Sequence, residues 1–124
     1  MRRISYDSND LITKSSIVRS SEEQSVAIIR VTIRTFQNEE HAQLFLAVSD
    51  QTIPALEEKG IKVNAKIAIT QNKKHEVISV WEYDDEAHMK MVRSAIAKFS
   101  ALPNSLSPKE ISFQAKIVKD IKTG

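Results

Sequence analysis

Three side chains that can take part in chemistry lie close together where a strand-like pattern gives way to a helix-like one. Trp81 and Tyr83 stand in the run VISVWEY, and His88 follows in DDEAHMKMV. Histidine suits general-base work because its ordinary pKa is about 6.5. A tryptophan beside a helix start can act on an aromatic substrate, or it can simply pack beneath the helix. We therefore take His88 and Trp81 as candidate catalytic residues, with a packing role as the alternative for each.

Two arginines on the first apolar run are the next candidates. Arg30 and Arg34 alternate with apolar residues in SVAIIRVTIRTF. Together with Tyr83, their side chains could bind and polarise a phenolic or carboxylated substrate. The alternative is that arginines on an exposed strand face only meet water. Tyr83, Arg30 and Arg34 are thus the predicted substrate-binding residues.

The composition excludes several kinds of site. The chain has no cysteine and only two glycines, so it has neither a thiolate centre nor a Gly-rich phosphate loop. Its three histidines, His41, His75 and His88, show no metal-ligand spacing. We predict neither a metal nor a cofactor. Eighteen basic against sixteen acidic residues leave a net charge of +2, too small a surplus to indicate nucleic-acid binding.

The length of 124 residues fits one domain. Residues 1–24 are rich in serine and show no sustained periodicity, so we predict an arm laid against the domain, 25–124, or against its partner. No apolar run approaches the roughly 20 residues that span a bilayer. The N-terminus also lacks the apolar stretch of a secretory signal, so the predicted location is cytoplasmic.

Hydrophobic periodicity predicts the elements that would hold these residues. Alternating runs predict strands over 25–36, 61–70, 76–83 and 111–119. Asn38 and one of Asp84 or Asp85 are suited to begin the helices that follow the first and third strands. Pro54 predicts a kink or break near Thr52, followed by a short segment ended by Gly60. The order β-α-β-β-α-β predicts an α+β, ferredoxin-like fold, a four-stranded antiparallel sheet with helices on one face.

The alternation also predicts which residues share a face. We expect the apolar set, which begins with Ala27, Ile29, Val31 and Ile33, to lie against the helices. The polar face would then carry Arg30, Thr32, Arg34, Asn64, Lys66, Ser112, Gln114 and Lys116. The third strand adds to it either Glu76, Ile78, Val80 and Glu82 or Val77, Ser79, Trp81 and Tyr83. This polar face would meet water, or a partner's sheet across a polar chamber.

The strand-to-helix junction VWEYDDEAHMKMV resembles the dimeric α/β-barrel superfamily, within it the antibiotic-biosynthesis monooxygenase-like group. In that group a strand often ends in a Trp-Glu pair, followed by acidic residues and an Ala-rich helix with a histidine. The matching residues are Val80, Trp81, Glu82, Asp84, Asp85, Glu86, Ala87 and His88. The resemblance covers about residues 25–120. It implies a homodimer whose two sheets form a barrel with the helices outside, and pockets between sheet and helices or within the barrel.

The resemblance implies several activities, but haem degradation is not expected for this chain. The group includes cofactor-independent oxygenases of polyphenolic or quinol-like substrates, haem-degrading enzymes and isomerases. The haem-degrading members resemble one another in a first-strand asparagine and in a tryptophan and a downstream histidine on the second helix. The first strand here, VAIIRVTIRTF, has no asparagine, and HMKMVRSAIAKF has neither a tryptophan nor a second histidine.

Three functional hypotheses follow. The first is a cofactor-independent, monooxygenase-like enzyme acting on a small aromatic or quinol-like substrate. The second is a non-catalytic dimer that binds a small molecule or serves as a scaffold. The third is single-stranded nucleic-acid binding on the sheet, with charge from Arg30, Arg34, Lys66 and Lys116 and stacking on Trp81 and Tyr83. Against the third, the first and last strands place no aromatic residue on that face.

Overall fold

The computed structural model describes residues 26–124, so the predicted N-terminal arm of residues 1–24 lies outside the described residues. The elements are β1 (Ile28–Thr35), α2 (Glu39–Ser49), α3 (Thr52–Glu58), β2 (Asn64–Thr70), β3 (Lys73–Tyr83), α4 (Glu86–Ala95), α5 (Ala97–Ser100), the 3-10 turn η1 (Asn104–Leu106) and β4 (Lys109–Lys116). Their order follows the predicted β-α-β-β-α-β pattern, with each helical region divided into two pieces.

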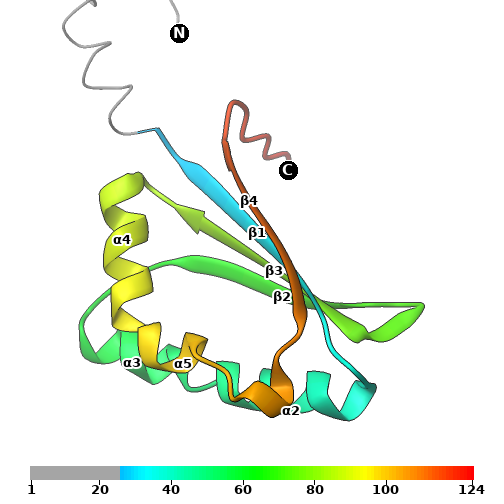
Figure 1. Ribbon diagram of the computed structural model, residues 1–124. Helices are drawn as coiled ribbons and strands as arrows, with labels where there is room; N and C mark the ends of the chain where they lie inside the picture. The colour runs from blue at the N-terminus through cyan, green and yellow to red at the C-terminus, as the bar shows by residue number, and fades with distance from the viewer. Residues whose placement is uncertain (1–25) are drawn as a thin grey trace, which may run out of the picture.

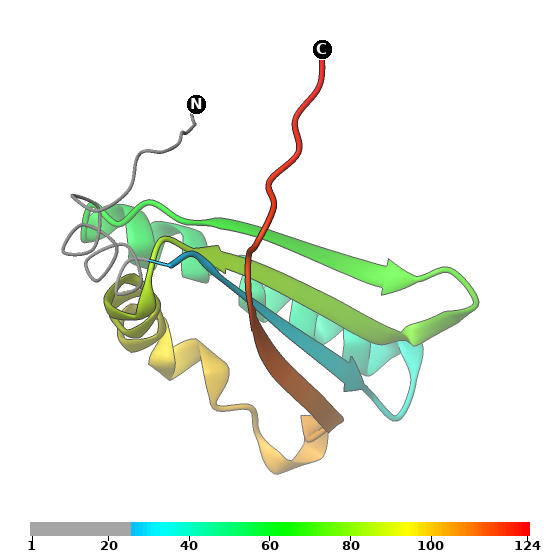
Figure 2. The ribbon, with the colours of Figure 1, turned by 90° about the horizontal axis from the view of Figure 1, so that it is seen from above.

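The four strands form one antiparallel sheet in the order β2-β3-β1-β4. The helices lie on one side of it, and the other side is open (Figure 1). Seen from above, α2 runs beneath β2 and β3, while α4 and α5 lie toward the β1 and β4 side (Figure 2). The predicted α+β, ferredoxin-like fold is confirmed.

The helix ends follow from single residues. The Asn38 side chain accepts a hydrogen bond from the His41 main-chain N–H at 2.8 Å and so caps α2. Asp85, one of the two predicted caps, accepts a hydrogen bond from the His88 N–H at 2.8 Å. Pro54 lies in the first turn of α3, where its missing N–H costs nothing, and Gly60 follows that helix with a φ of 67°.

Two apolar clusters lie between the sheet and the helices. One joins the α4 side to the end of β3 and consists of Leu56, Tyr83, Met89, Val92 and Ile96. The other joins α2 to the start of β3 and consists of Phe36, Ala42, Phe45 and Val77. Both depend on β3, whose odd-numbered residues Val77, Ser79 and Tyr83 are buried. This result settles the open register of the third strand, because Trp81 shares their face.

The predicted assignment of the two sheet faces is wrong for β1 and β4. Arg30 is paired with Trp81 and Thr32 with Ser79, so the polar residues of β1 lie on the helix side of the sheet. In β4, Gln114 pairs with Arg30 and therefore lies on that side as well. The physical reason is that the helices pack mainly against β3. The β1–β4 half of this face is left without a close helical cover, so the paired side chains of Arg30 and Gln114 keep access to water, whereas Thr32 is buried.

The opposite face of the sheet is largely apolar. It carries Ile29, Val31 and Ile33 of β1, Ile78 and Val80 of β3, and Ile111, Phe113 and Ala115 of β4. Asn64, Lys66 and Glu82 lie at its β2 side. Ile111 is 65% exposed and Phe113 is 51% exposed. The prediction that two sheets would meet through hydrophilic sides is therefore wrong, because the side that faces away from the helices is the hydrophobic one.

Candidate functional site

A cavity of about 270 Å³ lies between strands β1, β3 and β4 on one side and α4 on the other. It is lined by Arg30, Thr32, Arg34, Ser79, Trp81, Tyr83, Arg93, Ile96, Glu110 and Ser112. We call this space the sheet–helix cavity. Four of the five predicted site residues lie in its wall: Arg30, Arg34, Trp81 and Tyr83. The fifth, His88, does not.

Trp81 and Tyr83 form an aromatic wall. They are two residues apart on one strand, so both point to the same side of the sheet. Their ring centroids are 6.4 Å apart and their planes differ by only 13°. The Tyr83 side chain is almost completely buried, and this burial raises the pKa of its phenol against the opposing effects of Arg93 and Arg30. Tyr83 therefore keeps its proton and stays a hydrogen-bond donor at neutral pH.

Arg34 is fixed by several partners. Its Nε donates to Glu110 Oε2 at 3.0 Å, and one terminal nitrogen donates to Ser79 Oγ at 3.2 Å. Its guanidinium also lies 4.9 Å from the centre of the Phe45 ring, within cation–π range. With its charge already paired to Glu110, Arg34 chiefly organises the cavity floor.

Arg30 differs because its hydrogen-bonding partner is neutral. One terminal nitrogen donates to Gln114 Oε1 at 2.8 Å. Burial lowers the pKa of Arg30, and the charge of Arg93 lowers it further. Two guanidinium groups thus act on one another at the cavity.

Arg93 is a lining residue that the sequence analysis missed. It lies on α4 next to Val92, which is buried. The sequence signal for it is an arginine beside an apolar residue of a helix that packs on a strand.

His88 holds the start of α4 in place. The Asp84 main-chain N–H donates to His88 Nδ1 at 2.9 Å, and His88 Nε2 lies 2.7 Å from the Lys62 carbonyl oxygen. Since an N–H can only donate and a carbonyl can only accept, Nδ1 is the acceptor and Nε2 carries the proton. The ring also meets Tyr83 edge-on, with centroids 5.9 Å apart. Both nitrogens are thus engaged with the main chain.

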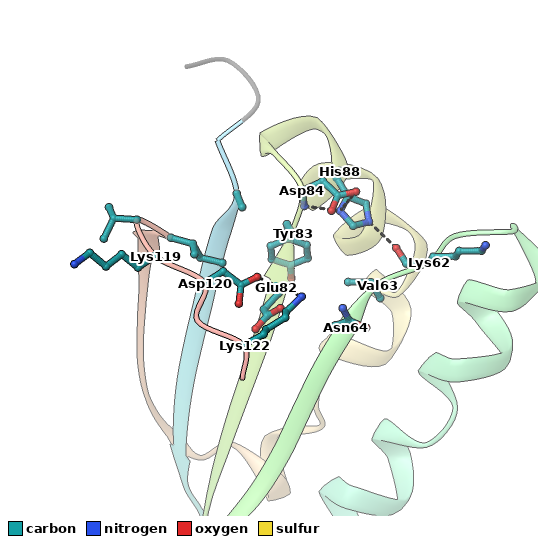
Figure 3. A pocket seen from close by; sticks show the side chains of 13 residues that line it. Lys62, Val63, Asn64, Glu82, Tyr83, Asp84, His88, Lys119, Asp120 and Lys122 are labelled. Atoms are coloured by element: carbon teal, nitrogen blue, oxygen red, sulfur yellow. Dashed lines mark hydrogen bonds and ion pairs between the residues drawn. The ribbon is translucent and has the colours of Figure 1, made fainter. Parts of the chain in front are cut away.

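His88 lines a second, larger space of about 690 Å³ at the end of the sheet, next to the C-terminal segment (Figure 3). Its charged lining residues are Lys62, Lys119, Lys122, Glu82, Asp84 and Asp120. Positive and negative charges balance, and Lys122 lies 3.6 Å from Asp120. Nothing in this lining favours one sign of ligand charge.

Within residues 26–124, no group of three or more histidine or acidic side chains is arranged to hold a metal ion. No helix of the same residues has the length and apolarity that a bilayer crossing demands.

Comparison with solved structures identifies the fold. The chain is similar to a dimeric ferredoxin-like protein from an uncultured marine organism, with a TM-score of 0.65, 16% identity and coverage of 85% of this chain and 99% of that one. A second dimeric ferredoxin-like protein from an uncultured marine organism gives a TM-score of 0.59 and 19% identity, over 77% of this chain and 99% of that chain.

A cofactor-independent oxygenase shares the same fold. A single-residue mutant of SnoaB from Streptomyces nogalater gives a TM-score of 0.58 at 11% identity, over 78% of this chain and 98% of that one. No protein-family model and no curated protein matches the chain by sequence. The predicted resemblance is confirmed at the level of the fold, since the neighbours include dimeric ferredoxin-like proteins and an oxygenase of this kind.

Proposed function

We propose that the chain forms a homodimer that binds a small aromatic molecule in the sheet–helix cavity and acts on a quinol-like substrate as a cofactor-independent monooxygenase. The observation that carries this proposal is the aromatic wall of Trp81 and Tyr83 next to the guanidinium of Arg30. An aromatic ring can lie on that wall while an ionised or polar substituent reaches the arginine.

The open apolar face supports the homodimer. Ile111 and Phe113 stay more than half exposed in the single chain, and a second copy can cover them by contributing the same face. Two of the structural neighbours are dimeric. In such a dimer the sheet–helix cavity stays on the outer side of each sheet, so each subunit keeps its own site.

The cavity suits oxidation of an electron-rich ring. Without a cofactor, the electrons that reduce dioxygen must come from the substrate, and a phenolate gives them up more readily than a phenol. A nearby positive charge favours the ionised phenol, and Arg30 can supply that charge. Trp81 would hold the ring, whereas we assign His88 to positioning the start of α4 because both of its nitrogens are hydrogen-bonded to the main chain.

Oxygen uptake with 1,4-dihydroxynaphthalene, a simple quinol, tests the enzyme. Wild-type protein should consume oxygen faster than the quinol oxidises unaided. Trp81→Phe, which shrinks the aromatic wall, should reduce kcat/KM about tenfold. His88→Ala should reduce kcat/KM only to the extent that it disturbs the fold. His41→Ala, which replaces another histidine, is the matched control. A rate equal to autoxidation, or equal rates in wild type and Trp81→Phe, would remove the enzymatic proposal.

The second candidate is a ligand-binding dimer without catalysis. One observation favours it: among the described residues that line the sheet–helix cavity, Glu110 is the only carboxylate or histidine, and it is bonded to Arg34. The cavity therefore holds no free general base among its described lining residues. Quenching of Trp81 fluorescence by a quinol, with no oxygen uptake, would support this candidate over the enzyme.

A further inference from the structure

The sheet–helix cavity carries more positive charge than its own residues neutralise. Among the described residues that line it, Arg30, Arg34 and Arg93 face one acid, Glu110, so two positive charges remain. Glu110 is bonded to Arg34, and among the charged groups that act on Arg30 its effect is smaller than that of Arg93. Neither Arg30 nor Arg93 forms an ion pair with any residue in the range 26–124. These two guanidinium groups are thus the uncompensated part of the cavity.

A third donor lies beside the two arginines. The Tyr83 side chain is only 3% exposed, and its hydroxyl has no hydrogen-bond partner within the described part of the chain. A buried hydroxyl without a partner is costly, and a ligand that accepts its hydrogen bond removes that cost. Arg30, Arg93 and this phenol line the same cavity. The charges of both arginines oppose the rise of the Tyr83 pKa. The two guanidinium groups can only donate and carry positive charge, and the Tyr83 hydroxyl can donate beside them, so the group that satisfies all three is an anionic acceptor.

We infer that the ligand of this cavity is a hydroxy-substituted aromatic carboxylic acid, whose carboxylate is bound by Arg30 and Arg93 with a hydrogen bond from Tyr83. This inference rests on the proposed ligand-binding function and narrows its substrate class. A guanidinium matches the two oxygens of a carboxylate in a planar, two-bond geometry. The carboxylate supplies one negative charge against the two positive charges that remain in the cavity.

The size of the cavity agrees with a compact ligand. An apolar cavity of about 150 Å³ holds benzene. The sheet–helix cavity, at about 270 Å³, leaves room for one ring with a carboxylate and a hydroxyl group. The ring would lie on Trp81, the only tryptophan of the chain, so its fluorescence reports occupancy directly.

The test compares two probes of equal size on the intact protein: 4-hydroxybenzoate and its neutral analogue 4-hydroxybenzamide. Titration is followed by Trp81 fluorescence and by calorimetry. We expect the carboxylate to bind at least ten times more tightly than the amide, and added salt to weaken only the carboxylate. Arg93→Gln and Arg30→Gln should each weaken carboxylate binding about ten- to hundredfold while changing amide binding little.

Lys90→Gln is the matched control, because it removes one positive charge from the same helix at an exposed position outside the cavity lining. It should leave the preference for the carboxylate unchanged. Arg93 is exposed on α4, so its replacement should leave the core intact. If Arg30→Gln fails to fold, Arg93→Gln alone still tests whether the arginines bind the carboxylate. Tyr83→Phe keeps the ring and should lower carboxylate affinity only.

The possible results separate this inference from the proposed function. Equal affinity for the acid and the amide, or an unchanged preference in Arg93→Gln, overturns the inference. If the inference fails but quinols still quench Trp81 fluorescence, the proposed function stands without a carboxylate-binding site. Absence of quenching by acid, amide and quinol alike at millimolar concentrations overturns both.

Discussion

A charge placed on the open apolar face should separate the proposed dimer. Phe113 is 51% exposed in the single chain, so roughly half of its side-chain surface remains to be covered. An aromatic side chain buries about 150–250 Å², which leaves on the order of 100 Å² for a partner to cover. At about 25 cal/mol per Å², this contact contributes about 2.5 kcal/mol per copy, and a twofold interface contains it twice.

Phe113→Asp removes that contact and leaves a carboxylate facing apolar side chains. The loss of about 5 kcal/mol corresponds to a dissociation constant raised by more than three orders of magnitude, before the cost of covering the charge is included. The assay is sedimentation equilibrium over a concentration series. Wild type should have twice the 14.0 kDa chain mass, and the variant should have the mass of one chain.

Leu44→Asp provides the control, because Leu44 is 50% exposed but lies on α2 in the helix layer. It introduces the same charge at the same degree of exposure and should leave the dimer intact. A wild-type protein of single-chain mass would refute the reasoning. So would a Phe113→Asp variant that stays dimeric with an unchanged dissociation constant, since the apolar face would then not be the interface.

Three further outcomes follow from the structure. His88→Ala breaks two hydrogen bonds to main-chain groups and should lower the free energy of unfolding by about 2 kcal/mol in urea denaturation, whereas His41→Ala should change it by less than about 0.5 kcal/mol. Gly60→Ala forces a side chain into a φ of 67° and should cost about 1 kcal/mol by the same measurement; no loss would show that the turn relaxes freely. The pKa of Tyr83 is raised in the folded protein, so the folded state holds this proton more tightly and stability should fall as the pH rises above about 10 and through the raised value. Tyr83→Phe should flatten that alkaline decline, and a decline of equal size in the variant would contradict the assignment.

The element order was predictable because it depends on local signals. Asn38 and Asp85 can begin helices through their own side chains, and Pro54 and Gly60 restrict the backbone wherever they stand. These effects need no knowledge of distant residues. The antiparallel four-stranded sheet with helices on one face then follows from the order of the elements.

The sheet faces were not predictable in the same way. Alternation shows that Arg30 and Val31 point to opposite sides, but it does not show which side the helices cover. The sequence favours the more apolar set of β1 as the one that packs under the helices, as in a single sheet with one face in water. The opposite holds, because β3 supplies most of the helix contact and β1 follows the register of β3. Arg93 was missed for a related reason: its neighbourhood depends on which face of β1 α4 meets.

The alternation along β1 has a practical consequence for redesign. Thr32 lines the sheet–helix cavity, and its neighbours Val31 and Ile33 lie on the open face. A library that varies only the even-numbered positions of this strand would change the shape and chemistry of the sheet–helix cavity. A library restricted to odd-numbered positions would instead change the apolar face that we propose for dimer formation. The two properties can therefore be evolved in separate rounds along one short stretch of sequence.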